Sequence, residues 1–191
     1  MVSTRPSKGK LSSTVGVPGA LTVNVPKGLV TGFELDGQVN LTSWMSVGTS
    51  IAYTDARYTE NLVSIQGAAP VAFGTYPDTP RWNGTVYAEF SQPVGKGLEL
   101  TFRPELYGET SDWTSGTGNL DPGTQLPGYV LANLRLELHN SAQGWSVSAN
   151  VKNLFNRVYY IGAESLGTLF QVDTATPGDP RMATVEARYN F

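Results

Sequence analysis

The chain has no cysteine, one histidine and little charge, and each scarcity excludes a class of function. Without cysteine there is no disulfide, no zinc–thiolate site and no cysteine nucleophile. Only 15% of the residues are Asp, Glu, Lys or Arg, whereas an ordinary soluble domain has about 25%. The net charge is −3 and no Lys/Arg cluster occurs, which argues against a nucleic-acid-binding surface.

Long apolar runs are absent as well. No window of about 18 apolar residues occurs, so the sequence predicts no transmembrane helix. A barrel strand crosses a bilayer with only about 9–11 alternating residues, so insertion by strands stays open. The first residues lack the apolar stretch of a secretory signal, and an exported protein should carry one in its precursor. We therefore expect that a signal was removed or that the parent chain is longer.

What the chain does have is alternation of apolar and polar residues at period two. In the first run Phe33 and Leu35 share one side, while Glu34 and Asp36 share the other. Successive side chains of a strand point to opposite faces, so the run predicts a strand with one apolar and one polar face. Seven such strands are predicted, at about Leu21–Thr42, Trp44–Thr59, Arg81–Ser91, Leu98–Glu109, Tyr129–His139, Trp145–Ile161 and Met182–Phe191.

The connections between these strands alternate between short and long. Outer-membrane barrels show this alternation, with short periplasmic turns and longer extracellular loops. The predicted fold is therefore all-β: a long-stranded antiparallel up-and-down meander that forms part of a transmembrane barrel. Bacterial single-chain barrels close with an even number of strands, so seven strands indicate a C-terminal section. Residues 1–20 are then expected to be an irregular piece of an outer loop, and residues 21–191 the barrel section.

Aromatic residues near the strand ends are typical of the girdles at the two membrane interfaces. Cross-strand aromatic packing in a soluble sheet is the alternative. The residues concerned are Trp44 and Trp145 beside short turns, and Tyr58, Trp82, Tyr107 and Tyr159 toward the long loops.

Several segments resemble, in their order along the chain, the barrels of TonB-dependent outer-membrane receptors. The most specific is Val151–Tyr159, which is similar to the family's Asn-Leu-Phe-Asp element with its downstream tyrosine. Asn156 stands where Asp is commoner in the family. The element supplies Asn153, Leu154, Phe155 and Tyr159, and the other segments are Gly32–Asp36, Tyr53–Tyr58, Thr79–Trp82, Leu126–Tyr129 and Pro177–Arg181.

The resemblance implies a 22-stranded barrel with a plug, in the outer membrane of a Gram-negative bacterium. Such receptors take up scarce ligands, such as iron–siderophores, cobalamin or oligosaccharides, with energy passed on by the TonB complex. Nothing in the chain resembles the plug or the TonB-contacting box, so the chain by itself should not transport. By the same resemblance, Ala187, Tyr189 and the final Phe191 look like the signal that the barrel assembly machinery recognises. Outer-membrane lipid is the other expected partner.

Four aromatic residues in the long loops are the candidates for ligand contact: Trp113, Tyr76, Phe73 and Phe170. They either stack on a sugar or siderophore or pack the loops together, and the sequence does not decide between these. Neither a metal site nor a cofactor is predicted, because the loop carboxylates lack the compact spacing of a calcium site.

Two other hypotheses about the fold and function stay open. The first is a small soluble ligand-binding barrel, similar to a lipocalin, with its apolar faces turned inward. The second is an outer-membrane hydrolase built on His139 and Ser141. Neighbouring polar residues at a turn are common, so we predict that the chain is not an enzyme.

Overall fold

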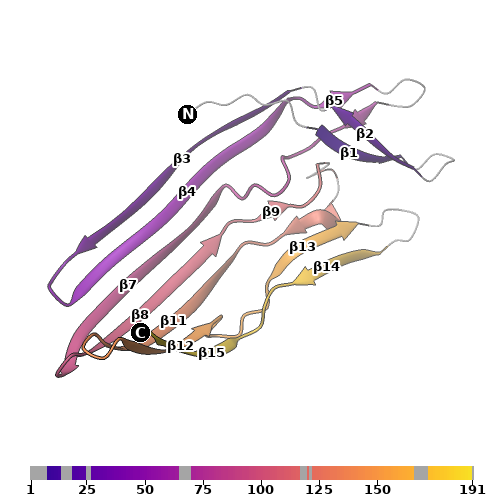
Figure 1. The fold of residues 1–191 in the computed structure, drawn as a ribbon. Coiled ribbons are helices and arrows are strands. Elements are labelled where there is room, and N and C mark those ends of the chain that lie inside the picture. The colour runs from indigo at the N-terminus through magenta and orange to yellow at the C-terminus, as the bar shows by residue number, and fades with distance from the viewer. Residues whose placement is uncertain are drawn as a thin grey trace.

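One seven-stranded antiparallel sheet dominates the computed structural model, which describes residues 8–13, 19–24, 27–64, 70–116, 120, 122–165 and 172–190. Its order is β15-β12-β11-β8-β7-β4-β3 (Figure 1). The two edge strands are not paired with each other, so the sheet is not closed. The predicted meander is confirmed. The strands are β3 (Lys27–Asn40), β4 (Met45–Glu60), β7 (Trp82–Gly95), β8 (Leu98–Glu109), β11 (Tyr129–Asn140), β12 (Trp145–Lys152) and β15 (Met182–Tyr189).

Short turns lie at one end of the sheet and long connections at the other, as the sequence predicts (Figure 1). Gly97 and Gly144 adopt positive φ angles of 73° and 69° in two of the short turns, a conformation that glycine adopts without strain. Within the described residues, no helix is long and apolar enough to cross a membrane. The long connections carry β5 (Leu62–Val63) with β6 (Val71–Ala72), β9 (Asp112–Trp113) with β10 (Gln125–Leu126), the short 3-10 helix η2 (Pro122–Thr124), and β13 (Tyr160–Ser165) with β14 (Asp173–Pro177).

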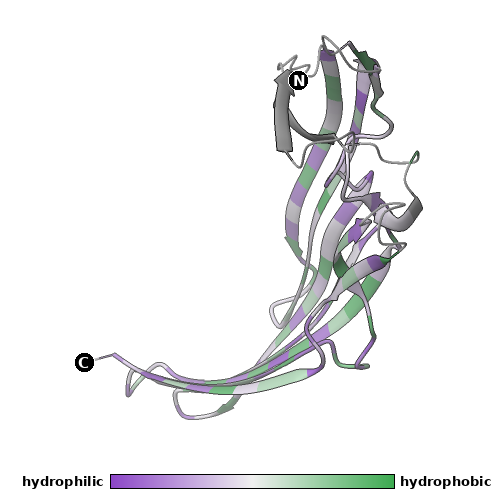
Figure 2. Cartoon of the chain, turned by 90° about the vertical axis from the view of Figure 1, so that its right-hand side faces the viewer, coloured by the Kyte–Doolittle hydropathy of each residue, from purple (hydrophilic) through white to green (hydrophobic). Residues whose placement is uncertain are grey.

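The two faces of the sheet differ in chemistry and in exposure. On the apolar face Leu35 is 55% exposed and Val185 is 77% exposed, whereas Ser46 and Ser148 on the polar face are 8% and 4% exposed. Side chains crowd on the concave side of a curved sheet, so the polar face is the concave one; Figure 2 shows the curvature. The soluble barrel with a dry apolar centre is therefore contradicted.

The first predicted strand is wrong before Lys27. Within the predicted irregular segment, β1 (Lys8–Ser13) is a strand, and it pairs with β2 (Gly19–Asn24) in a hairpin of its own. The long strand β3 begins only at Lys27, where the ladder with β4 shifts register between Lys27 and Gly28. A bulge is expected there, because Pro26 has no N–H to donate to a ladder.

The sixth predicted strand is wrong beyond Lys152. The chain leaves the sheet there, and Asn153 and Asn156 adopt positive φ angles of 49° and 51°. Asparagine tolerates this left-handed conformation better than most residues, so the segment forms a turn. Tyr160 then begins β13, in a separate hairpin.

A proline lies in the middle of β8, a central strand. Pro104 pairs with Leu134 of β11 on one side. On the other side the ladder between β7 and β8 has no pairing at Ala88 and Glu89, although the register is the same above and below. Proline has no N–H for the ladder, so the strand continues at the cost of a local gap.

Candidate functional site

The long connections contact one another at one end of the sheet. The backbone N–H of Asp78, after β4, donates a hydrogen bond of 2.8 Å to the carbonyl of Trp113, after β8. The hydroxyl of Thr114 donates to the carbonyl of Ala163, after β12. These bonds link three connections that are far apart in sequence. We call this group of connections the loop body.

Two of the predicted ligand residues, Phe73 and Tyr76, pack on one ring. Phe73 is 7% exposed and its ring lies 5.2 Å from that of Tyr58, while Tyr76 stacks on Tyr58 at 4.7 Å. Phe73 therefore packs the loop body together. Trp113 is half-buried in the neighbouring connection, and Phe170 lies outside the described residues.

A second aromatic cluster lies on the polar face and contains none of the four predicted ligand residues. The ring of Tyr129 is 6.1 Å from that of Tyr107 and 4.5 Å from that of Tyr159. The hydroxyl of Tyr107 donates a 2.8 Å hydrogen bond to Glu109. Tyr107 has the same parity along β8 as Glu105 and Glu109, and that signal was available in the sequence.

The prediction of an outer aromatic girdle is therefore wrong for the tyrosines. Tyr107 and Tyr159 lie in the polar-face cluster, and Tyr58 shares the parity of Ser46, also on the polar face. The apolar face has a different aromatic group near the long connections. There the ring of Trp82 lies 5.6 Å from that of Phe33 and 4.8 Å from that of Tyr53.

The Asn-Leu-Phe-Asn element forms a turn held by side-chain hydrogen bonds. Asn153 is 3% exposed. Its amide nitrogen donates to the carbonyls of Arg157 (2.8 Å) and Asp179 (3.1 Å), and its oxygen accepts from the Arg157 N–H (2.8 Å). The Asn156 oxygen accepts from the N–H of Arg181 at 2.9 Å. We call this segment, residues 153–159, the asparagine turn.

Tyr159 completes the asparagine turn. Its hydroxyl accepts a 3.1 Å hydrogen bond from the N–H of Asp179, and its ring covers Gly178 so closely that a Cβ atom there would overlap it. The N–H of Leu154 donates to the carbonyl of Ala132 at 2.7 Å. The turn thus connects β11 with the segment before β15, just beyond Lys152, where β12 ends.

Among the described residues, the other members of the predicted family and assembly signals lie on the apolar side. Phe155 is 79% exposed and lines a hollow with apolar-face residues such as Phe102. Ala187 and Tyr189 pair with Val147 and Trp145 of β12. Phe191 lies outside the described residues.

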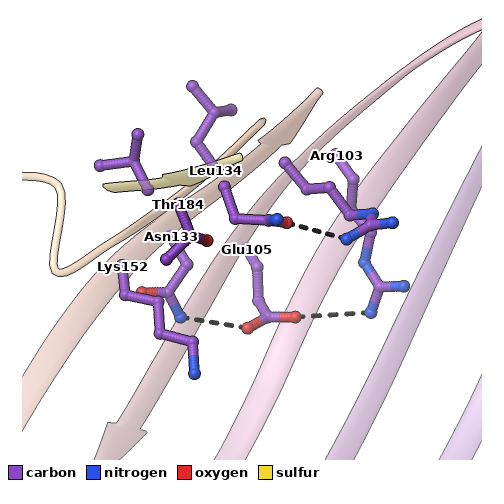
Figure 3. A pocket seen from close by; sticks show the side chains of 9 residues that line it. Arg103, Glu105, Asn133, Leu134, Lys152 and Thr184 are labelled. Carbon is purple, nitrogen blue, oxygen red and sulfur yellow. Dashed lines mark hydrogen bonds and ion pairs between the residues drawn. The ribbon is translucent and has the colours of Figure 1, made fainter. Parts of the chain in front are cut away.

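Charged side chains cross the polar face near its middle (Figure 3). Arg103 lies over the ring of Tyr87 at 3.8 Å and forms ion pairs with Glu105 (3.4 Å) and Glu89 (3.9 Å). Arg135 pairs with Glu137 at 2.6 Å. These groups are partly exposed, so the pairs add little stability by themselves.

Asp112 is a buried carboxyl group in the loop body. It accepts a 2.7 Å hydrogen bond from the N–H of Trp113. Burial raises the pKa of Asp112, while hydrogen bonds from the backbone of Trp113 and Thr79 act in the opposite direction. No group of three or more His, Cys, Asp or Glu side chains suited to a metal ion occurs among the described residues.

The residues of the hydrolase hypothesis do not form a catalytic pair. The N–H and hydroxyl of Ser141 both donate to the carbonyl of Gly97, at 3.0 and 3.4 Å. The hydroxyl of Ser141 is therefore bonded to a turn carbonyl instead of the imidazole of His139.

A sequence model of one protein family, described as TonB dependent receptor-like, beta-barrel, matches residues 7–154. The chain belongs to this family. No curated protein sequence matches it. The TonB-dependent receptors are receptors and transporters of the Gram-negative outer membrane, which confirms the predicted localisation and fold.

Solved structures of TonB-dependent receptors share the fold. The ferric preacinetobactin receptor BauA from Acinetobacter baumannii is 17% identical, with a TM-score of 0.66 over 97% of this chain and 25% of the receptor. The ferric yersiniabactin uptake receptor FyuA from Yersinia pestis is 15% identical, with a TM-score of 0.71 over 100% of this chain and 34% of the receptor. The copper transporter OprC is 16% identical, with a TM-score of 0.72 over 100% and 28%. The chain thus spans about a quarter to a third of these relatives.

Proposed function

We propose that this chain is the C-terminal barrel section of an outer-membrane receptor that takes up a scarce small-molecule ligand with energy supplied through TonB. The observation that carries the proposal is the unclosed seven-stranded meander with a concave polar face, in a chain of this family. Such a sheet becomes the wall of a water-filled barrel only when further strands close it. By itself it leaves two edges without hydrogen-bond partners.

The apolar face is proposed to contact lipid. Its large side chains, such as Leu35, Leu106 and Val185, are more than half exposed, which in water would be a large apolar patch. In a bilayer the same surface is matched to the acyl chains.

We propose that the ligand contacts the loop body and the polar-face cluster of Tyr107, Tyr129 and Tyr159. Tyr76 and Trp113 are the aromatic candidates, while Phe73 is committed to packing. Hydrogen bonds between the connections hold these residues in place before a ligand arrives, which lowers the entropy lost on binding. The structural neighbours are named for ferric siderophores and copper, so a metal or its chelate is the class best supported.

Uptake by cells tests the function. The gene that encodes this chain is deleted, and growth is measured on ferric siderophores, copper, cobalamin or oligosaccharides as the limiting nutrient. Growth on one of them should fail, and should fail equally when TonB is deleted. Unchanged growth and unchanged uptake of every labelled ligand would contradict the proposal. In the complemented strain, Trp113→Ala should weaken ligand binding about tenfold, as for an aromatic anchor, whereas Trp145→Ala at the short-turn end should not.

The C-terminal residues are proposed to act in assembly. Deleting Phe191 from the full protein should lower its level in the outer membrane, because the assembly machinery would no longer recognise the last strand. Phe191→Tyr, which keeps an aromatic residue at this position, is the matched control. If quantitative blots of the membrane fraction show equal levels for the deletion and the substitution, Phe191 has no such role.

A further inference from the structure

We propose that the concave wall carries an oxyanion site that takes one carboxylate group. The site is a hollow on the polar face between the middle strand β8 and the edge strand β15, to which β8, β11, β12 and β15 all contribute (Figure 3). We call it the wall pocket. Its polar lining includes Arg103, Glu105, Arg135, Asn150, Lys152 and Thr184.

The side-chain oxygens of Glu105, Asn133 and Asn150 in the wall pocket each already accept a hydrogen bond or form an ion pair. One oxygen of Glu105 accepts from the amide of Asn133 at 3.1 Å, and the other accepts from Arg103 at 3.4 Å. The side-chain oxygen of Asn150 accepts from Arg135 at 2.9 Å. The side-chain oxygen of Asn133 accepts from the backbone N–H of Asn153 at 3.0 Å. A guest that needs acceptors therefore finds few.

The donors, in contrast, are available. Within the part of the chain that the structure describes, the ammonium group of Lys152 and the hydroxyl of Thr184 have no hydrogen-bond or ion-pair partner. The amide nitrogen of Asn150 likewise donates to no described residue, because only its oxygen is engaged. Three donor groups from two adjacent strands thus line one hollow, and the guest that satisfies them is an acceptor.

Charge defines the guest further. Arg103 and Arg135 lie directly opposite each other on neighbouring strands, an unfavourable arrangement for like charges. Each is offset by its own carboxylates: Glu105 and Glu89 for Arg103, and Glu137 for Arg135. With Lys152 the three cations equal the three carboxylates, so the group as a whole is neutral. Lys152 is the one of the three cations that forms no ion pair with a described carboxylate. A guest with one negative charge fits this pocket better than a dianion.

The carboxylate has two possible sources with the same chemistry. It belongs either to a free organic acid in the bore or to an Asp or Glu side chain of a polypeptide segment that occupies the bore. The site itself follows from the donors and charges of the wall, and it does not depend on which ligand the receptor takes up.

Thermal unfolding of the detergent-solubilised full protein, with and without acetate as the probe, tests the site. Lys152→Gln removes the ammonium charge, and Thr184→Val removes the hydroxyl donor at nearly constant shape. Arg188→Gln is the matched control, because Arg188 lies on the same face, is paired with Glu186 at 2.8 Å and does not line the pocket. Chloride at equal ionic strength controls for screening.

Each outcome has a defined meaning. If the guest is a free acid, acetate raises the midpoint saturably, and Lys152→Gln weakens this response about tenfold, as expected for losing a charged hydrogen bond. If the guest is a side chain, Lys152→Gln and Thr184→Val lower the midpoint without acetate, whereas Arg188→Gln does not. The proposal is overturned if Lys152→Gln and Arg188→Gln behave alike in both measurements. Uptake assays are separate, so failure here leaves the receptor function untouched.

Discussion

The two edges of the sheet are built in different ways. At the first edge β3 and β4 pair from Asn40 out to Lys27, in an almost continuous ladder. At the opposite edge β12 and β15 pair over only eight positions, from Trp145 to Lys152, and the asparagine turn follows. The ladder uses N–H and C=O groups that nearly every residue supplies. The turn uses the side chains of particular residues, so substitutions should have large effects there and small effects along the ladder.

Asn153→Ala should show the largest effect. It removes three hydrogen bonds from a buried side chain and places alanine at a positive φ. Leaving buried polar groups unpaired costs about 1–3 kcal/mol each, so we expect a loss of about 3 kcal/mol or more in thermal unfolding of the solubilised protein. Asn83→Ala in β7, whose side chain has no described hydrogen bond, is the control. Equal losses for the two variants would remove the distinction between turn and ladder.

A pair of glycines sharpens the comparison. Gly178→Ala places a methyl group against the ring of Tyr159 in the turn, whereas a Cβ at Gly37 in β3 meets nothing within 4 Å. Overpacking costs about 1–3 kcal/mol, so Gly178→Ala should lower the unfolding midpoint. Gly37→Ala should leave it unchanged or raise it slightly, because alanine restricts the unfolded chain. A midpoint for Gly178→Ala at or above the parent value would show that the turn has room to adjust.

Asp112→Asn tests whether the stability of the loop body also depends on single side chains. Burial raises the pKa of Asp112, so the folded state holds this proton more tightly than the unfolded chain does. Its stabilisation is fully present below the ordinary aspartate pKa of about 3.9 and is lost as the pH rises through the raised value. The unfolding midpoint of Asp112→Asn should not show this pH dependence when it is measured from the ordinary aspartate pKa up through the raised pKa of Asp112. Asp36→Asn, at an exposed position of β3, should retain it.

The smallest effect is expected at the outer end of the long ladder. Lys27 and Glu60 form an ion pair of 2.7 Å between side chains that are 71% and 48% exposed. Water and salt screen such a pair, so Lys27→Gln should leave the unfolding midpoint unchanged within error. A clear drop that disappears at high salt would show that the pair supports the edge strand.

Much of the ladder could be predicted from the sequence, because alternation is a direct record of which face each side chain occupies. The same signal failed where the chain turns without changing phase. Leu21 and Val23 continue the alternation of Phe33 and Leu35, so period two could not show that residues 19–24 belong to another hairpin. Only Pro26 marked the break.

The site was harder to predict, since it depends on contacts between segments far apart in sequence. Asn153 was recognised by resemblance, but its hydrogen bonds to Asp179 and Arg157 follow from the fold. The loop strands β5 and β6 have two residues each, too few to show any period. The donors of the wall pocket lie on strands whose parity was predicted correctly, so their shared face was foreseeable and their shared hollow was not.

The gap beside Pro104 has a mechanical consequence. Two successive rungs are missing between β7 and β8, while the pairing of β8 with β11 is unbroken through the same height. When neighbouring strands press on this wall, shear and bending will concentrate along that seam, since only side-chain contacts, among them the ion pair between Arg103 and Glu89, cross it there. The barrel wall thus contains a line of lower stiffness at mid-height, with one carboxylate partner of Arg103 on each side of it.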